Sequence, residues 1–311
     1  MSAMSNLAGL YPPKGEQIWN PALHWQPIPV HTLPMEEDNI ISSHANCPRL
    51  KKMMEDVAAN DPTILNIISQ NDWVFKYLTN HTGAKITNLL DIDYLYDTLF
   101  IENLYNKTLP PWTHQVFPDK MKPMKDLSFK LSTWTHEMKR LRSGPLVQSI
   151  IDHFQGFIDK QHSRKMLMYS GHDTTLSSLL NTLGMFDPPI GPPYASLIMI
   201  ELSKKGDEFV VNFSYRNDTS VEPYALTVFN CPFDCPLEDF VRLTQDLRPN
   251  DWKSECGLLQ DPTMEAVTIF SIGTAFIMAL ILVLSVIFAL VRRQCYGQRD
   301  DNKTYKYSSI N

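Results

Sequence analysis

Apolar residues recur three or four positions apart through most of residues 48–158, which is the spacing of one face of a helix. Asp61 followed by Pro62 is a typical helix start. The pair Gly144-Pro145 predicts that one helix ends there and another begins. The pattern therefore predicts a block of separate helices over 48–158.

After residue 158 the pattern changes. Residues 166–170 form a short apolar run typical of a buried strand, and leucines at 176, 179, 180 and 183 predict a helix that ends near Gly184. Two apolar runs, 198–202 and 209–213, flank a glycine turn and predict a hairpin. Pro236 predicts the start of a last helix. The chain is thus expected to be of the α/β class.

One stretch is too apolar for an ordinary globular core. Residues 266–291 contain no charged side chain, and about 20 such residues suffice to cross a bilayer as a helix. Basic residues follow this stretch directly, beginning with Arg292 and Arg293, whereas Asp261 and Glu265 precede it. We therefore expect a luminal or extracellular domain over 1–263, a transmembrane helix over 264–291 and a cytoplasmic tail over 292–311, as in a single-pass type I membrane protein.

Sequons and cysteines agree with a location outside the cytosol for residues 1–263. Four cysteines precede the apolar stretch and could form two disulfides in three ways; the short spacing of Cys231 and Cys235 favours a local loop, which leaves Cys47 with Cys256. Four N-glycosylation acceptors lie in the same part of the chain. They are Asn80, Asn106, Asn212 and Asn217.

The amino-terminal residues have neither a basic segment nor an apolar segment of the kind that signal peptides contain. The parallel strands that an α/β core would need also have no obvious sequence. We therefore expect either an amino-terminally incomplete fold or an alternative product that does not reach the lumen. The chain is acidic, with a net charge of −6, and offers no basic stripe that would bind nucleic acid.

His172 and Asp173 lie at the predicted turn between the strand and the leucine-rich helix. Ligands, and phosphates above all, bind where a strand ends and a helix amino terminus faces it. Asp173 could instead only cap that helix, which would leave His172 unexplained. A metal-dependent hydrolase is disfavoured because no His-x-x-x-His or comparable cluster of ligands occurs, so we expect no metal and no cofactor.

Several motifs together resemble the histidine acid phosphatases, in particular the membrane-anchored lysosomal and prostatic forms. The matching stretches extend from residue 1 to about 256 and include 1–8, 46–49, 109–112, 168–175, 193–196, 215–217 and 251–256. The resemblance implies a mixed central sheet with flanking helices and a helical subdomain. It also implies hydrolysis of phosphate monoesters at acid pH through a phosphohistidine.

The resemblance assigns roles to particular residues. His172 matches the histidine that holds the phosphoryl oxygens, and Asp173 matches the general acid that protonates the leaving alcohol. Trp112 matches a tryptophan of the substrate pocket; the alternative for a single aromatic residue is a place in the core. In the tail, Tyr307 and Ile310 have the spacing of a sorting signal that adaptor complexes read on the way to endosomes and lysosomes.

The family's nucleophile is not in this sequence. The motif Arg-His-Gly-x-Arg-x-Pro does not occur, and none of the nine histidines follows an arginine. Without a nucleophile the covalent step cannot take place. Two functions are therefore open: an acid phosphatase of the lysosome, endosome or cell surface whose chain is inactive alone, or a non-catalytic membrane isoform. Candidate partners are a phosphate monoester, the membrane, an adaptor complex and a second copy of the chain.

Overall fold

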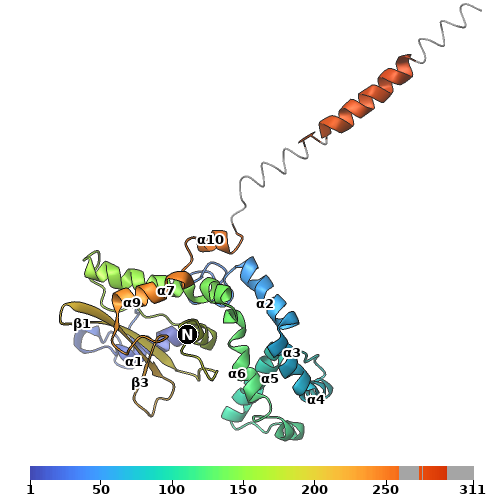
Figure 1. The fold of residues 1–311 in the computed structure, drawn as a ribbon. Coiled ribbons are helices and arrows are strands. Elements are labelled where there is room, and N and C mark those ends of the chain that lie inside the picture. Colours follow the sequence, from blue (N-terminus) through green and yellow to red (C-terminus); the bar gives the residue numbers. More distant parts are fainter. Residues whose placement is uncertain (259–272, 275, 293–311) are drawn as a thin grey trace, which may run out of the picture. The chain divides into compact units, whose positions relative to one another are not determined.

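The computed structural model describes residues 1–258, 273–274 and 276–292 (Figure 1). Residues Met1–Leu258 form one compact unit, and the first helix is α1 (Ser2–Leu10). The predicted helical block is present over 48–158. It consists of α2 (Pro48–Asn60), α3 (Pro62–Gln70), α4 (Asp72–Thr82), α5 (Leu89–Leu104), η2 (Pro111–Gln115), α6 (Lys122–Ser128), η3 (Leu131–Thr133) and α7 (His136–Ile158).

Helix starts in this block follow the local sequence. The Asp61 carboxylate accepts hydrogen bonds from the backbone N–H groups of Thr63 (2.9 Å) and Ile64 (3.2 Å), as expected of an N-cap residue. Asn88 caps α5 in the same way, through Leu90 N–H at 2.9 Å and Asp91 N–H at 3.0 Å. Local capping therefore decides where these two helices begin.

The prediction of a break at Gly144-Pro145 is wrong. Helix α7 continues through Pro145, although proline has no N–H to donate to the carbonyl of Leu141 one turn earlier. The indole N–H of Trp252 donates to that carbonyl instead, at 2.9 Å. A side chain at Gly144 would collide with the backbone of Leu247, so glycine lets this segment approach α7 closely. A tertiary hydrogen bond thus keeps α7 continuous across a proline that, by local sequence alone, predicts a break.

The sheet has four strands, and every pair among them is antiparallel. The predicted hairpin is present as β1 (Leu197–Lys205) and β2 (Glu208–Arg216), with Gly206 at φ 61° in the turn. Strand β2 also pairs with β3 (Tyr224–Leu226) and β4 (Cys235–Pro236). The remaining elements of residues 1–258 are η1 (Gly15–Gln17), α8 (Asp173–Thr182), α9 (Leu237–Leu243), η4 (Gln245–Leu247) and α10 (Trp252–Glu255).

The structure corrects the expected mixed sheet to an antiparallel one among the described residues. Residues 166–170, the predicted buried strand, are extended but belong to no strand, and their side chains are exposed. The apolar run could indicate a tendency to form a strand, but a strand exists only where a second strand supplies its backbone hydrogen bonds. No described segment of the chain pairs with it.

Four apolar clusters form the interior of the described residues 1–258, and two of them are large. The larger cluster lies between α7, α8, α9 and β2, with Val147, Ile151, Leu183, Val211 and Phe240 almost completely buried. The second cluster lies among α3–α6 and includes Leu78 and Ile92. Burial of aliphatic and aromatic side chains at this level contributes about 1.5 to 3 kcal/mol for each side chain.

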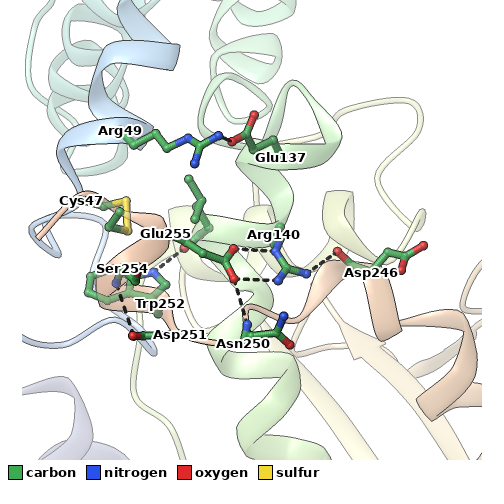
Figure 2. Close-up of polar contacts among 12 residues, drawn as sticks. Cys47, Arg49, Glu137, Arg140, Asp246, Asn250, Asp251, Trp252, Ser254 and Glu255 are labelled. Atoms are coloured by element: carbon green, nitrogen blue, oxygen red, sulfur yellow. Dashed lines mark hydrogen bonds and ion pairs between the residues drawn. A yellow bond between two sulfur atoms is a disulfide. The ribbon is translucent and has the colours of Figure 1, made fainter. Parts of the chain in front are cut away.

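Residues 246–256, which come last in the unit Met1–Leu258, bind α7 through an ion pair and hydrogen bonds (Figure 2). Arg140 of α7 donates to both carboxylate oxygens of Glu255, at 2.6 and 2.7 Å, and to the carbonyl oxygen of Asp246 at 2.9 Å. Glu255 also accepts from the backbone N–H of Asn250 at 2.9 Å. The hydrogen bonds of Arg140 lower the pKa of Glu255 below its usual value, so they favour its ionised form.

The structure contains the two disulfides that the sequence favours, Cys47–Cys256 and Cys231–Cys235. The first joins the residue before α2 to the residue after α10, across 209 residues of sequence. On the chain-entropy model, closing a loop of this length stabilises the fold by about 5 kcal/mol, against about 2 kcal/mol for the four-residue separation of the second.

The predicted transmembrane helix over 264–291 lies partly outside the described residues. Its described residues, 273–274 and 276–291, are helical. In the part of the chain that the structure describes, no helix is long and apolar enough to cross a membrane. Most of the predicted tail, with Tyr307 and Ile310, also lies outside that part.

We predict that Glu255→Gln lowers the free energy of unfolding by about 2 kcal/mol at pH 5 to 7. The substitution removes the negative charge that accepts two hydrogen bonds from Arg140. Urea or thermal unfolding of the full chain measures this. Glu137→Gln is the control: it breaks an exposed ion pair with Arg49, and we expect a loss of less than about 1 kcal/mol. Equal losses in the two variants would contradict the prediction.

Candidate functional site

The candidate site is built around the amino terminus of α8. His172 is its N-cap residue and Asp173 its first helical residue, and both side chains are exposed. One carboxylate oxygen of Asp173 accepts from the backbone N–H of Thr174 at 2.7 Å. Asp173 is therefore not the N-cap residue that the capping interpretation expects, although its carboxylate binds a backbone N–H group of the first turn. An exposed histidine and carboxylate thus lie at a helix end that favours anions.

Thr175 fixes the orientation of this helix start. Its hydroxyl accepts from the backbone N–H of His172 at 3.1 Å and donates to the carbonyl of Ile41 at 2.6 Å. Ser42, next in the chain, accepts from the buried guanidinium of Arg142 in α7 at 2.9 Å. The loop around residues 38–44 therefore connects the site to α7, the longest described helix of residues 1–258.

Asp93 of α5 lies within electrostatic reach of Asp173. Burial raises the pKa of Asp93 to about 6; Lys125 opposes this shift, and the charges of Asp173 and Asp97 add to it. The raised pKa of Asp93 therefore indicates that Asp93 and Asp173, which are distant in the sequence, act on each other electrostatically. Sequence analysis missed Asp93, and the one available signal was a charged residue at a helical position otherwise occupied by apolar residues.

A proline-rich loop after α8 is hydrogen-bonded to acidic residues of α5 and α6. The backbone N–H of Gly191 donates to the carboxylate of Asp126 in α6 at 2.9 Å, and the hydroxyl of Tyr194 donates to Asp97 of α5 at 3.3 Å. Burial raises the pKa of Tyr194, and the negative charges of Asp97 and Asp173 raise it further. The charge of Asp173 thus acts on a tyrosine that is hydrogen-bonded to a second acidic residue, Asp97.

Trp112 lies elsewhere in the helical block. Its ring stacks on His81 with the ring centroids 5.5 Å apart, and its carbonyl accepts from the hydroxyl of Tyr77 at 3.0 Å. It is partly buried against the cluster of α3–α6. No described contact joins it to His172 or Asp173, so its contacts are those of a residue at the edge of the core.

The sequons differ in their surroundings. Asn80, Asn106 and Asn217 are exposed. Asn212 lies inside β2, paired with Glu201, and its amide oxygen is buried. Among the residues that the structure describes, no group of three or more histidine, cysteine or acidic side chains could hold a metal ion.

We predict that Asp93→Asn stabilises the chain at pH 7 by on the order of 1 to 2 kcal/mol. The raised pKa means that wild-type stability is favoured at low pH and declines as the pH rises from about 4 to about 6. Thermal unfolding of the full chain across this range should show a smaller slope in the variant. Asp56→Asn, on the exposed side of α2, should keep the wild-type slope; an unchanged slope in Asp93→Asn would refute the prediction.

Comparison with known proteins places the chain in a family. A family model described as histidine phosphatase superfamily (branch 2) matches residues 1–219. The chain is 39% identical to prostatic acid phosphatase of Bos taurus over 263 residues, which is 83% of this chain and 67% of that protein. It is 35% identical to lysosomal acid phosphatase of Homo sapiens over 297 residues, 93% of this chain and 70% of that protein. The chain therefore belongs to branch 2 of the histidine phosphatase superfamily.

Proposed function

We propose that this chain is an acid phosphatase subunit that supplies the phosphate-stabilising and proton-donating side of the site for hydrolysis of phosphate monoesters. The observation that carries the proposal is the placement of His172 and Asp173 at the amino terminus of α8, beside Asp93. The named relatives, prostatic and lysosomal acid phosphatases, support the same reaction class.

The two residues take different roles in this proposal. A phosphoryl group at the helix amino terminus meets the positive end of the helix dipole, and the protonated imidazole of His172 donates a hydrogen bond to an oxygen on which charge develops. Asp173, in its neutral form, gives its proton to the oxygen of the departing alcohol. Its exposed carboxyl group has room for that alcohol.

Asp93 accounts for a preference for acid pH. Below a pH of about 6 its carboxyl group is mostly neutral, and above that pH it adds a negative charge close to Asp173. A phosphate monoester is itself an anion, so it meets less repulsion in the acidic range.

The proposal requires a nucleophile that these 311 residues do not supply in the family's form. We propose that the chain alone does not complete the phosphohistidine step, and that it becomes active when the Arg-His-Gly-x-Arg-x-Pro segment is joined to it. The alternative is a non-catalytic isoform that keeps the phosphate-binding side; the missing motif is the observation that favours it.

We expect the chain as given to release no product from 4-nitrophenyl phosphate near pH 5, and the chain extended upstream with that motif to hydrolyse it. In the extended chain, Asp173→Asn should lower kcat by roughly 100-fold or more, because the leaving group loses its proton donor. Asp251→Asn, at a helix cap away from the site, is the control. Activity of the chain as given, abolished by Asp173→Asn, would mean that another nucleophile serves.

We also propose a lysosomal or endosomal location, in line with the named lysosomal relatives. The predicted membrane span, the tail and its signal at Tyr307 and Ile310 stay predictions from the sequence, as does pairing with an adaptor complex. The sequons fit passage through the secretory pathway in this proposal.

On this basis we predict glycans at Asn80, Asn106 and Asn217 and none at Asn212, because the Asn212 amide is held inside strand β2. Mass spectrometry of tryptic peptides from chain expressed in a secretory host, before and after enzymatic deglycosylation, measures occupancy at each site. Occupancy at Asn212 equal to that at Asn217 would contradict the prediction.

A further inference from the structure

Four aromatic side chains form a continuous row along α4 and onto η2. The ring centroids of Trp73 and Tyr77 lie 6.4 Å apart, those of Tyr77 and His81 4.3 Å, and those of His81 and Trp112 5.5 Å. Tyr77 and Trp112 are half-buried against the apolar cluster of α3–α6, whereas Trp73 is 44% exposed. The row therefore leads from the edge of the core to an exposed tryptophan.

Asn80, one of the four glycosylation acceptors, lies on the same helix beside this row. Its side chain is exposed and makes no hydrogen bond to any other described residue. With 3.6 residues per turn, Trp73 lies about 20° and Tyr77 about 60° from Asn80 around the helix axis. His81 lies about 100° away in the same sense, and Lys76 about 40° away in the opposite sense. The rings of α4 thus border one side of the acceptor.

The direction of the Asn80 side chain points a glycan along the row. Side chains of a helix lean toward its amino terminus and cover the turn before their own Cα atom. For Asn80 that turn contains Tyr77, about 4.5 Å back along the axis, and Trp73 follows about 6 Å further on. Sugars attached to the amide nitrogen of Asn80 therefore start over Tyr77 and continue toward the exposed Trp73.

The chemistry of the two partners is complementary. One face of an N-acetylglucosamine ring carries C–H groups, whose partial positive charge meets the negative face of an aromatic ring. The contact also removes exposed aromatic area from water, while the sugar hydroxyl groups stay in solvent. On the other side of Asn80, Lys76 is joined to Asp72 by an exposed ion pair of 2.6 Å and offers no such face.

We propose that the N-glycan on Asn80 folds back along α4 and packs its first sugars on Tyr77 and Trp73. The aromatic row is then an intramolecular binding surface for the chain's own carbohydrate. The packed glycan covers the exposed tryptophan and shields the bond between its first two sugars. This inference rests on the secretory route proposed above, because that route attaches the glycan.

The test is enzymatic release of glycans from the folded full chain. The chain is directed by a cleavable signal peptide into a secretory host that adds only oligomannose glycans. Endoglycosidase H cuts between the first two sugars, and mass spectrometry of peptides gives the release rate at each acceptor. We expect release at Asn80 to be roughly fivefold slower than at Asn217, an exposed acceptor just after β2. After heat denaturation the two rates should be equal.

Variants of α4 identify the cause of slow release. Trp73→Ala should raise the rate at Asn80 to that at Asn217, and Trp73→Phe, which keeps an aromatic face, should preserve most of the protection. Lys76→Ala is the matched control, because Lys76 is one helical turn from Asn80 on the side away from the rings. It should leave the rate unchanged. Far-UV circular dichroism verifies that each variant keeps its helices.

The outcomes separate this inference from the secretory route. Equal release at Asn80 and Asn217 in the folded chain would overturn the packing of the glycan and leave the secretory route in place. Equal effects of Trp73→Ala and Lys76→Ala, or an unoccupied Asn80 beside glycosylated Asn106 and Asn217, would do the same. A chain without glycans at any of these acceptors would refute the secretory route and this inference together.

Discussion

The hydrogen bond from the indole of Trp252 to the carbonyl of Leu141 is the constraint on which much of the structure depends. Pro145 leaves that carbonyl without its helical donor, and a buried carbonyl without a partner would cost free energy. Because Trp252 supplies the donor, α7 stays continuous from His136 to Ile158 and offers one long face to the core. The Cys47–Cys256 disulfide and the Arg140–Glu255 pair keep Trp252 beside it (Figure 2).

Helix α7 in turn supports the site. Arg142 is buried in its middle, and burial lowers the pKa of Arg142 to about 10. A buried cation is costly unless its N–H groups are bonded, and the carbonyl of Ser42 accepts one of them. The neighbouring carbonyl of Ile41 accepts from Thr175, which sets the start of α8. The position of His172 and Asp173 thus depends on a loop that is fixed from two helices.

The environment of Asp173 combines features that suit phosphate chemistry in acid. The amino terminus of α8 attracts an anion, whereas negative charges on Asp93 and Asp97 repel it. Protonation of Asp93 relieves this conflict as the pH falls. The Arg140–Glu255 pair behaves in the opposite way, because its hydrogen bonds lower the pKa of Glu255 and so favour the ionised carboxylate.

The sequence by itself determined the elements whose signals are local. Asp61 and Asn88 cap their helices, Gly206 makes the turn of the hairpin, and the leucines after Asp173 form α8, because each depends on neighbours within a few residues. Tertiary structure decided the rest. Whether Pro145 ends a helix depended on Trp252, 107 positions later, and whether residues 166–170 form a strand depended on a partner for their backbone. The electrostatic influence of Asp173 on Asp93 likewise joins residues 80 positions apart, which no local pattern encodes.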